Sequence, residues 1–373
     1  MIYNLSLFAV VFLSLKDRIR KRILIFLLIV AAMIRTFAAF PAAVEKYYST
    51  GIYPYISAAQ RILLGWIPFS IGDLLYAAFG IYLIYSLVKF IGTIRSKKAG
   101  SKYFMKVGMN ILTAALIVYI SFNLLWGLNY NRRGIAYQLH LDQLNYTNED
   151  LTEVTRLVAE KMKQLQPASM VSREKLQKKK YLFDHAVSSY HSLSDNIPII
   201  KYDHPAVKPS LYSYLGNYLG FTGYYNPFSG EAQVNTTVPS FVRPFTTCHE
   251  IGHQLGYAKE SEANFAGYLS ATSSNDSAFL YSVYFEMFAY AGRYLYYTDS
   301  MSLKEIRGNL LPGVKNDIKE LREFYEHYEN PVETAIDRLY SQYLKANQQP
   351  SGKMSYSEVV SMLIAYYKQH GKV

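Results

Sequence analysis

Residues 246–257 read TTCHEIGHQLGY and contain the pattern H-E-x-x-H. On a helix, His249 and His253 lie one turn apart on the same face, so their imidazole nitrogens can converge on one metal ion. Glu250 is rotated by about 100° from His249, which sets its carboxylate beside such an ion. A general base that takes a proton from metal-bound water has to stand there. This stretch therefore predicts a zinc site with a catalytic glutamate.

The flanking residues separate this interpretation from a chance match, which we expect on the order of once in a hundred such sequences. Cys248, Ile251 and Leu255 form an apolar stripe on the opposite face, which would bury the helix against a core. Gly256 follows three residues after His253, where a left-handed glycine can end a helix. Glu260 comes shortly afterwards. A catalytic zinc site with two histidines still needs such a third ligand.

Two glutamates compete for the role of third ligand. If a second helix begins near Lys259, Glu260 and Asn264 share one face of it and Glu262 points away. We therefore predict that Glu260 is the ligand and that Asn264 forms a hydrogen bond that orients a ligand histidine. Glu262 is the alternative ligand, although a solvated helix carboxylate is the favoured interpretation of that residue.

The pattern resembles two groups of proteins. H-E-x-x-H followed by E-S-E-A-N at 260–264 is similar to the gluzincin side of the zinc metallopeptidases, in which a glutamate is the third ligand. The chain also resembles a family of uncharacterised bacterial multi-pass membrane proteins, catalogued as a domain of unknown function. That resemblance rests on WGLNY at 126–130, PSL at 209–211, LGNY at 215–218, GYYNP at 223–227 and GEAQVNT at 230–236. It implies a membrane-bound zinc hydrolase with a zincin-like metallopeptidase core.

The net charge of +11 is concentrated in two short segments. Residues 16–22 carry +4 and residues 95–106 carry +5, so the rest of the 373-residue chain is nearly neutral. Basic charge confined to loops beside apolar runs is a topology signal rather than a phosphate-binding groove. We therefore expect no nucleic-acid partner. Cys248 is the single cysteine, which excludes an intramolecular disulfide.

Three apolar runs, at about 23–40, 71–94 and 107–128, are each long enough to cross about 30 Å of hydrocarbon. Whether residues 2–15, which are apolar but short, also insert is left open. Both basic loops should face the cytoplasm. Trp66 and Trp126 then fall at outer ends of spans, where amphipathic rings favour the interface. We expect a multi-pass protein of the bacterial inner membrane, with the lipid bilayer as a partner and the C-terminal part outside the cytoplasm.

This topology divides the chain into three parts. Residues 1–22 form an apolar segment and a basic cytoplasmic loop, residues 23–128 form a transmembrane anchor, and residues 129–373 form a mainly helical α+β domain of zincin-like type. Residues 231–236 alternate like a strand with one wet face. This strand is either the edge that binds an extended peptide in zincin-type enzymes or a plain interior strand. Arg132 and Arg133 directly follow the third span and are expected at lipid headgroups.

A hydrolase of this kind also needs groups that stabilise charge on the cleaved carbonyl. The candidates are Tyr224, Tyr225, Tyr281, Tyr284 and Arg293. Glu286 could orient a ligand histidine or pair with Arg293. The favoured function is a membrane-anchored zinc-dependent metallopeptidase that binds one Zn²⁺ and cleaves envelope proteins or peptides. The alternative is a non-catalytic envelope binding or scaffold protein stabilised by the metal. A transporter is disfavoured, because the spans contain few charged residues.

Overall fold

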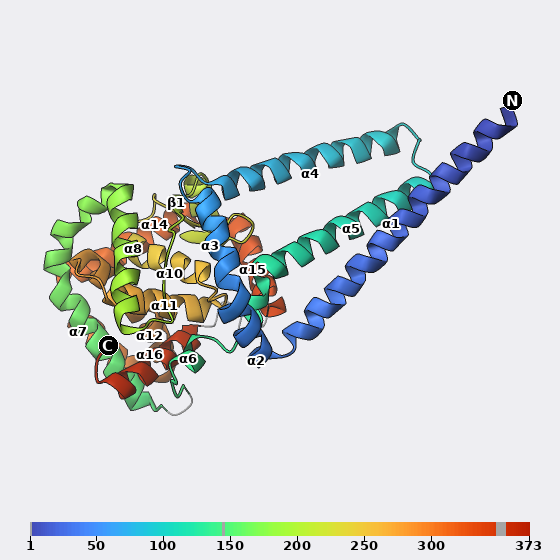
Figure 1. Cartoon of the computed structure of the whole chain (residues 1–373). Helices are drawn as coiled ribbons and strands as arrows, with labels where there is room; N and C mark the ends of the chain where they lie inside the picture. The colour runs from blue at the N-terminus through green and yellow to red at the C-terminus, as the bar shows by residue number, and fades with distance from the viewer. Residues whose placement is uncertain (1, 144–145, 348–355) are drawn as a thin grey trace.

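The computed structural model describes residues 2–143, 146–347 and 356–373, without the side chains of 2–18, 337, 346, 356 and 357. The N-terminal part is entirely helical (Figure 1). Its elements are α1 (Ile2–Ala38), α2 (Pro41–Ala43), the π-helix η1 (Val44–Ile52), α3 (Tyr53–Leu64), α4 (Ile71–Arg95) and α5 (Ser101–Leu125).

The C-terminal part is a mostly helical domain with a small sheet. Before the expected metal helix it contains η2 (Gly127–Asn131), α6 (Ile135–Gln138), α7 (Asn148–Arg173), η3 (Lys175–Gln177), α8 (Lys179–Asn196), β1 (Val207–Pro209), α9 (Ser213–Leu219), β2 (Gly223–Asn226) and β3 (Glu231–Val234). It continues with α10 (Arg243–Gln254), α11 (Glu260–Thr272), α12 (Ser277–Thr298), α13 (Ser300–Gly308), α14 (Pro312–Tyr328), α15 (Pro331–Ala346) and α16 (Tyr356–His370).

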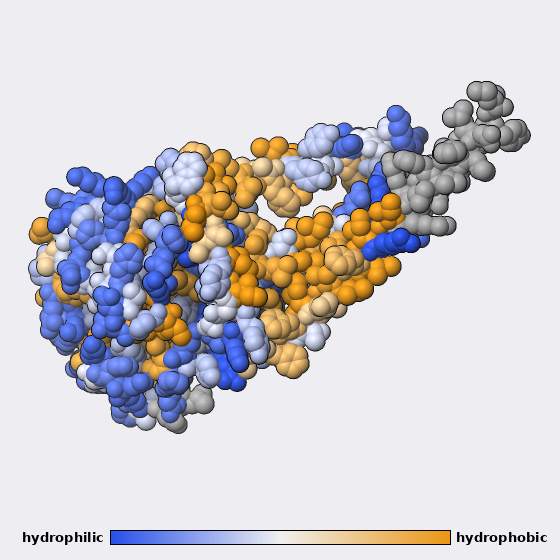
Figure 2. Space-filling view, viewed as in Figure 1, coloured by the Kyte–Doolittle hydropathy of each residue, from blue (hydrophilic) through white to orange (hydrophobic). Residues whose placement is uncertain are grey.

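Helices α4 and α5 project from this domain and are long and apolar enough to cross a membrane. They confirm the two expected spans, although the second helix runs from Ser101 to Leu125 and the expected last residues, Trp126 and Leu128, are buried in the domain instead. The third expected span, 23–40, falls within α1, whose Ile19–Ala38 part joins Pro41–Leu64 in a pair bent by 94°. Among the described residues, two helices, or three if this pair counts, can therefore span a bilayer. Apolar side chains cover these helices, whereas the far end of the domain is mostly hydrophilic (Figure 2).

The basic segment 16–22 is not the loop that we expected, because it lies inside α1. Residues 2–38 contain no glycine and no proline, so no residue breaks the helix there. Charged side chains are compatible with a helical backbone, and charge alone does not mark a helix end. The chain therefore continues as one helix from the N-terminal segment into the apolar run.

The sheet has the strand order β1-β3-β2, with β3 parallel to β1 and antiparallel to β2. β3 is thus an interior strand, so of the two alternatives the plain interior strand is confirmed and the peptide-binding edge is wrong. The expected wet face is also absent, because all four β3 residues are buried. Glu231 is buried since its carboxylate accepts hydrogen bonds from the backbone nitrogens of Ile71, at 3.2 Å, and Gly72, at 2.7 Å. A polar residue of β3 thereby holds the first turn of membrane helix α4.

Segment 41–66, together with residues 126–134 at the start of the C-terminal part, packs against the rest of the C-terminal domain. Val44, Tyr53 and Trp126 belong to one buried apolar cluster with Tyr225 of β2 and Ala258. Contacts therefore cross the expected domain boundary after residue 128.

Arg132 departs from the expected place at lipid headgroups. It is only 4% exposed, and its guanidinium pairs with Glu45 of η1 at 2.7 Å. Sequence proximity to a span does not reveal a carboxylate 87 residues away. The arginine thus joins the membrane-proximal segment to the domain instead of contacting lipid.

Candidate metal centre

The expected metal helix is α10, and its closest partner is α11. α10 ends at Gln254, and Gly256 then adopts a left-handed conformation with a φ of 85°. α11 begins at Glu260, directly after its N-cap Lys259. Small residues let the two helices approach closely, since a Cβ on Gly267 would lie 3.1 Å from the backbone nitrogen of His249. The turn and the close packing bring the start of α11 alongside the two histidines.

The structure brings together His249, Glu250, His253 and Glu260. One ligand atom from each of His249, Glu250 and His253 lies within 4.8 Å of the others. The Glu260 carboxylate faces both imidazoles, with Oε2 at 3.4 Å from His249 Nε2 and Oε1 at 3.8 Å from His253 Nε2. Glu260 therefore lies where the sequence predicted the third ligand.

A backbone contact fixes the orientation of the His253 ring. His253 Nδ1 lies 2.8 Å from the carbonyl oxygen of Tyr257. A carbonyl can only accept, so Nδ1 carries the proton and Nε2 keeps its lone pair. That lone pair is on the Glu260 side of the ring. Metal-binding histidines commonly donate the proton of their other ring nitrogen to a backbone carbonyl in this way, which fixes the orientation of the ring.

Asn264 lies one turn after Glu260, on the side of His249. Burial disfavours protonation of His249, but Glu260, Glu250 and Asn264 together outweigh it and raise the pKa of this histidine. The amide oxygen of Asn264 accepts a hydrogen bond of 3.4 Å from the Tyr290 hydroxyl. Asn264 is therefore next to the histidine that it was predicted to support.

Glu250 is buried against the first residue of β2. A Cβ on Gly223 would lie 2.6 Å from Glu250 Oε1, so only glycine leaves room for the carboxylate at this place. Burial raises the pKa of Glu250 to about 8, with Glu260 adding to the rise and His249 opposing it. Sequence reasoning did not find Gly223 as a site residue, because a glycine in a turn-rich segment gives no sign of what packs against it.

The other two ionisable groups of the cluster, His253 and Glu260, have lowered pKa values. Burial and the neighbouring His249 lower the pKa of His253 to about 4. Although burial opposes ionisation of Glu260, hydrogen bonds and charges from His249, His253 and Tyr340 lower its pKa to about 2. At neutral pH the cluster thus contains a neutral imidazole and a carboxylate anion, both in the form that binds metal ions.

Tyr340 of α15 is a site residue that the sequence did not reveal. Its hydroxyl donates a hydrogen bond of 2.5 Å to Glu260 Oε1. The ring packs edge-on against Phe221, which comes just before β2. In a chain with 36 tyrosines, no local signal distinguishes this one.

Glu262, the alternative ligand, points away from the histidines as expected for its helix face. It is 6% exposed, however, so the interpretation as a solvated carboxylate is wrong. Its carboxylate lies against the backbone of Gly134 and 3.5 Å from the ammonium group of Lys259. The residue fills the junction between α11 and the chain segment that follows α5.

The tyrosine candidates of β2 have structural contacts. The Tyr224 hydroxyl donates to Asp73 of α4 at 2.6 Å and lies 2.7 Å from the Ser210 hydroxyl. The Tyr225 ring packs on Trp126, with 5.2 Å between ring centroids. Both residues thus connect the sheet to the membrane helices, and neither hydroxyl is seen bonded to the histidine cluster.

Glu286 of α12 lies within electrostatic reach of both His249 and Arg293. Burial raises its pKa to about 7, and these two positive neighbours oppose the rise. Arg293 itself is exposed. Both roles considered for Glu286, orienting a histidine and pairing with Arg293, are therefore compatible with its position.

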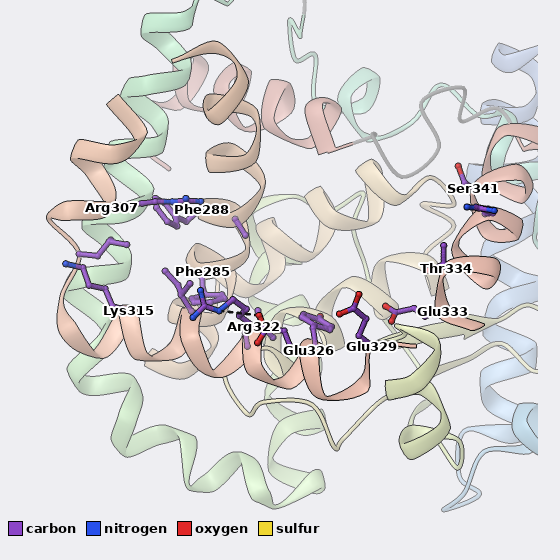
Figure 3. Close-up of a pocket in the computed structure, with 16 residues that line it drawn as sticks. Phe285, Phe288, Arg307, Lys315, Arg322, Glu326, Glu329, Glu333, Thr334 and Ser341 are labelled. Carbon is purple, nitrogen blue, oxygen red and sulfur yellow. Dashed lines mark ion pairs between the residues drawn. The ribbon is translucent and has the colours of Figure 1, made fainter. Parts of the chain in front are cut away.

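A cavity of about 990 Å³ lies between α12, α13, α14 and α15 (Figure 3). Its wall is apolar at Phe285 and Phe288, while Arg307, Arg322 and Glu329 carry charge at its rim. None of the lining residues belongs to the histidine cluster. Two of its helices nevertheless reach that cluster, α12 through Glu286 and α15 through Tyr340.

Comparison with known families gives one match, which covers residues 48–364 and is described as a protein family of unknown function, DUF3810. The chain belongs to this family. The matched region of DUF3810 includes α4, α5 and all the residues of the histidine cluster. No curated protein and no solved structure matches the chain. The resemblance to an uncharacterised family is thus confirmed, while its zincin-like core stays a prediction.

Proposed function

We propose that the protein is a membrane-anchored zinc-dependent hydrolase, and specifically a metallopeptidase. The observation that carries this proposal is the position of Glu260, whose two oxygens face the two Nε2 atoms at 3.4 and 3.8 Å. Ligands bound to a tetrahedral zinc ion at about 2.0–2.1 Å are separated from one another by roughly 3.3 Å. The two measured separations are close to this value, which supports His249, His253 and Glu260 as ligands of one Zn²⁺.

His249, His253 and Glu260 would hold a divalent cation, which would polarise a carbonyl group and lower the pKa of water, providing a nucleophile at neutral pH. Glu250 lies next to the histidines and is the group that accepts the proton and then delivers it to the leaving nitrogen. Its raised pKa suits a residue that exchanges a proton near neutral pH. The Tyr340 hydroxyl donates its single proton to Glu260 Oε1 and so orients the proposed third ligand.

The proposed location is the outer face of a bacterial inner membrane. The basic segment 95–106 links the far ends of α4 and α5, away from the domain (Figure 1). Positively charged loops favour the cytoplasmic side, which supports an extracytoplasmic domain. The substrates are then envelope proteins or peptides. The cavity beside α12 and α15 has room for part of such a polypeptide.

The test is a comparison of the parent protein with Glu250→Gln. Both are purified in lipid nanodiscs, and zinc content and cleavage of a peptide library are measured on the same samples. We expect the variant to retain zinc and to lose cleavage by about 10²- to 10⁴-fold, because only the proton acceptor is removed. Glu153→Gln, which changes an exposed carboxylate of α7, is the matched control and should behave like the parent.

Two outcomes would contradict the proposal. Cleavage that is unchanged in Glu250→Gln would show that this carboxylate does not take part. Zinc bound at equal levels in parent and variant, with no cleavage by either, would favour the metal-stabilised envelope binding or scaffold protein instead.

A further inference from the structure

Helix α15 presents three different faces. Val332, Leu339 and Tyr343, spaced by one or two turns, form an outward apolar stripe, and they are 57%, 61% and 39% exposed. Tyr340 lies on the neighbouring face, where its hydroxyl reaches Glu260 and its ring stacks on that of Tyr343. The third face, with Thr334, Arg338 and Ser341, lines the cavity of Figure 3. An apolar stripe on a helix that is otherwise in contact with protein requires a partner.

The stripe lies at the membrane end of the domain. The Tyr343 hydroxyl is 3.3 Å from that of Tyr130, which follows membrane helix α5 closely in the chain. Partial burial raises the pKa of Tyr343 to about 12, and Tyr76 of membrane helix α4 is near enough to add to the rise. In Figure 1, α15 lies beside the end of α5 that enters the domain. α15 is therefore next to the outer ends of both spans.

A second apolar group adjoins α15. Leu211, Tyr214 and Leu215, in and just before α9, are 54%, 64% and 52% exposed. The side-chain amide of Asn330, at the start of α15, donates to the carbonyl oxygen of Tyr218 in α9 at 2.7 Å. The backbone nitrogen of Leu211 donates to Asp73 in the first turn of α4, also at 2.7 Å. The two apolar groups are thus connected to each other and to a membrane helix.

We propose that these six residues (Leu211, Tyr214, Leu215, Val332, Leu339 and Tyr343), the α9–α15 surface, dock on the lipid bilayer that α4 and α5 span. The partner follows from continuity, because the surface adjoins the ends of two helices whose apolar sides already require lipid. Leucine, valine and tyrosine are also the side chains that enter the boundary between headgroups and acyl chains.

Docking places the histidine cluster close to the lipid surface. α15 touches the bilayer with one face and Glu260 with another, so lipid contact positions Tyr340 over the cluster. This step rests on the proposed hydrolase function. A histidine cluster close to the lipid surface favours polypeptides that are held at the membrane as substrates, rather than polypeptides free in solution.

Spin labels test the surface independently of catalysis. Single cysteines are introduced at Leu339 and Leu215, and at Lys319 on α14 as a matched exposed control. The native Cys248 is completely buried, and unmodified protein measures its background labelling. In nanodiscs we expect the labels at 339 and 215 to collide more with oxygen than with a water-soluble nickel complex, and the label at 319 to show the reverse. Labels at 339 and 215 that behave like the one at 319 would overturn the proposal.

A second variant tests the consequence for substrates. Val332→Glu combined with Leu339→Glu should reduce cleavage of a lipid-anchored peptide at least about tenfold, with little change for the same peptide free in solution. Equal loss for both peptides would refute the link between lipid contact and the cluster. A parent protein that cleaves neither peptide would contradict the hydrolase, whereas the spin-label result would still decide whether the surface meets lipid.

Discussion

Replacing Glu45 with glutamine should destabilise the junction between the membrane-proximal segment and the domain. The Glu45 carboxylate forms a bidentate pair with Arg132, at 2.7 and 3.0 Å. It also accepts hydrogen bonds from the backbone nitrogens of Arg133 and Gly134, at 3.1 and 3.3 Å, and from the side chain of Gln138, at 2.7 Å. Glutamine keeps the size of the side chain but removes the charge that neutralises Arg132.

The expected loss is large because Arg132 is buried. Leaving a buried charge without its partner typically costs about 3–5 kcal/mol. For a domain of 150–250 residues, each kcal/mol lowers the melting temperature by about 2–4 °C, so the variant should melt roughly 6–20 °C below the parent. Intrinsic fluorescence during heating in nanodiscs measures this shift, and Trp126, in the buried cluster beside the junction, is a suitable reporter.

Glu153→Gln is the matched control, because it breaks an ion pair in which both side chains are about half exposed. Such surface pairs contribute only about 0.2–1 kcal/mol. A Glu45→Gln variant that melts within about 2 °C of this control would refute the reasoning. It would mean that Arg132 finds water or another acceptor when the carboxylate is lost.

Two further predictions concern the histidine cluster. Gly223→Ala would set a Cβ 2.6 Å from Glu250 Oε1, so we expect this variant to retain zinc but to cleave about a hundredfold more slowly. Gly308→Ala is the control, because a Cβ there would have nothing within 4 Å, and it should leave zinc content and cleavage unchanged. Cation binding requires deprotonated His249, whose pKa is raised, and a cation should also displace the proton of Glu250, whose pKa is about 8. Zinc affinity should therefore rise as the pH is raised from about 6.5 to 8. Calorimetry in buffers of different ionisation enthalpy measures the protons released on binding. A zinc affinity that stays constant over this range would contradict the assignment of these residues to a metal site.

Local signals in the sequence predicted how the side chains of the histidine cluster are arranged. The spacing of His249 and His253 needed only a helix, and Gly256 takes the left-handed conformation that ends it. Thr147 caps α7 in a capping box with Asp150, as the pattern of these two residues suggests. Each of these features depends on residues within one or two helical turns of each other. Such short-range interactions can be predicted from the local sequence pattern.

Features that depend on distant partners could not be predicted in this way. Tyr340 reaches Glu260 across 80 residues, and Arg132 reaches Glu45 across 87. The strand β3 alternates in sequence like a half-exposed strand, but buried partners satisfy its polar side chains. Periodicity reports which residues share a face, and it does not report what covers that face.

The dependence of α10 on the membrane-proximal segment follows from the contacts at the end of this helix. The last carbonyls of a helix have no partner within the helix. Here the Trp126 indole donates to the carbonyl oxygen of His253 at 3.0 Å, and the Tyr53 hydroxyl donates to that of Gln254 at 2.8 Å. Arg132 donates to the carbonyl oxygen of Gly256 at 3.1 Å.

These donors belong to a part of the chain that the sequence assigns mainly to a transmembrane anchor. A protein cut before residue 129 would lose the Tyr53 and Trp126 donors and the Glu45 partner of Arg132, and would leave buried carbonyl groups unsatisfied beside His253. The boundaries of the family match are consistent with this view, since the matched region begins at residue 48, within η1, and not at the C-terminal domain. The unit that holds the histidine cluster therefore includes the segment at the membrane, and the two have to be studied together.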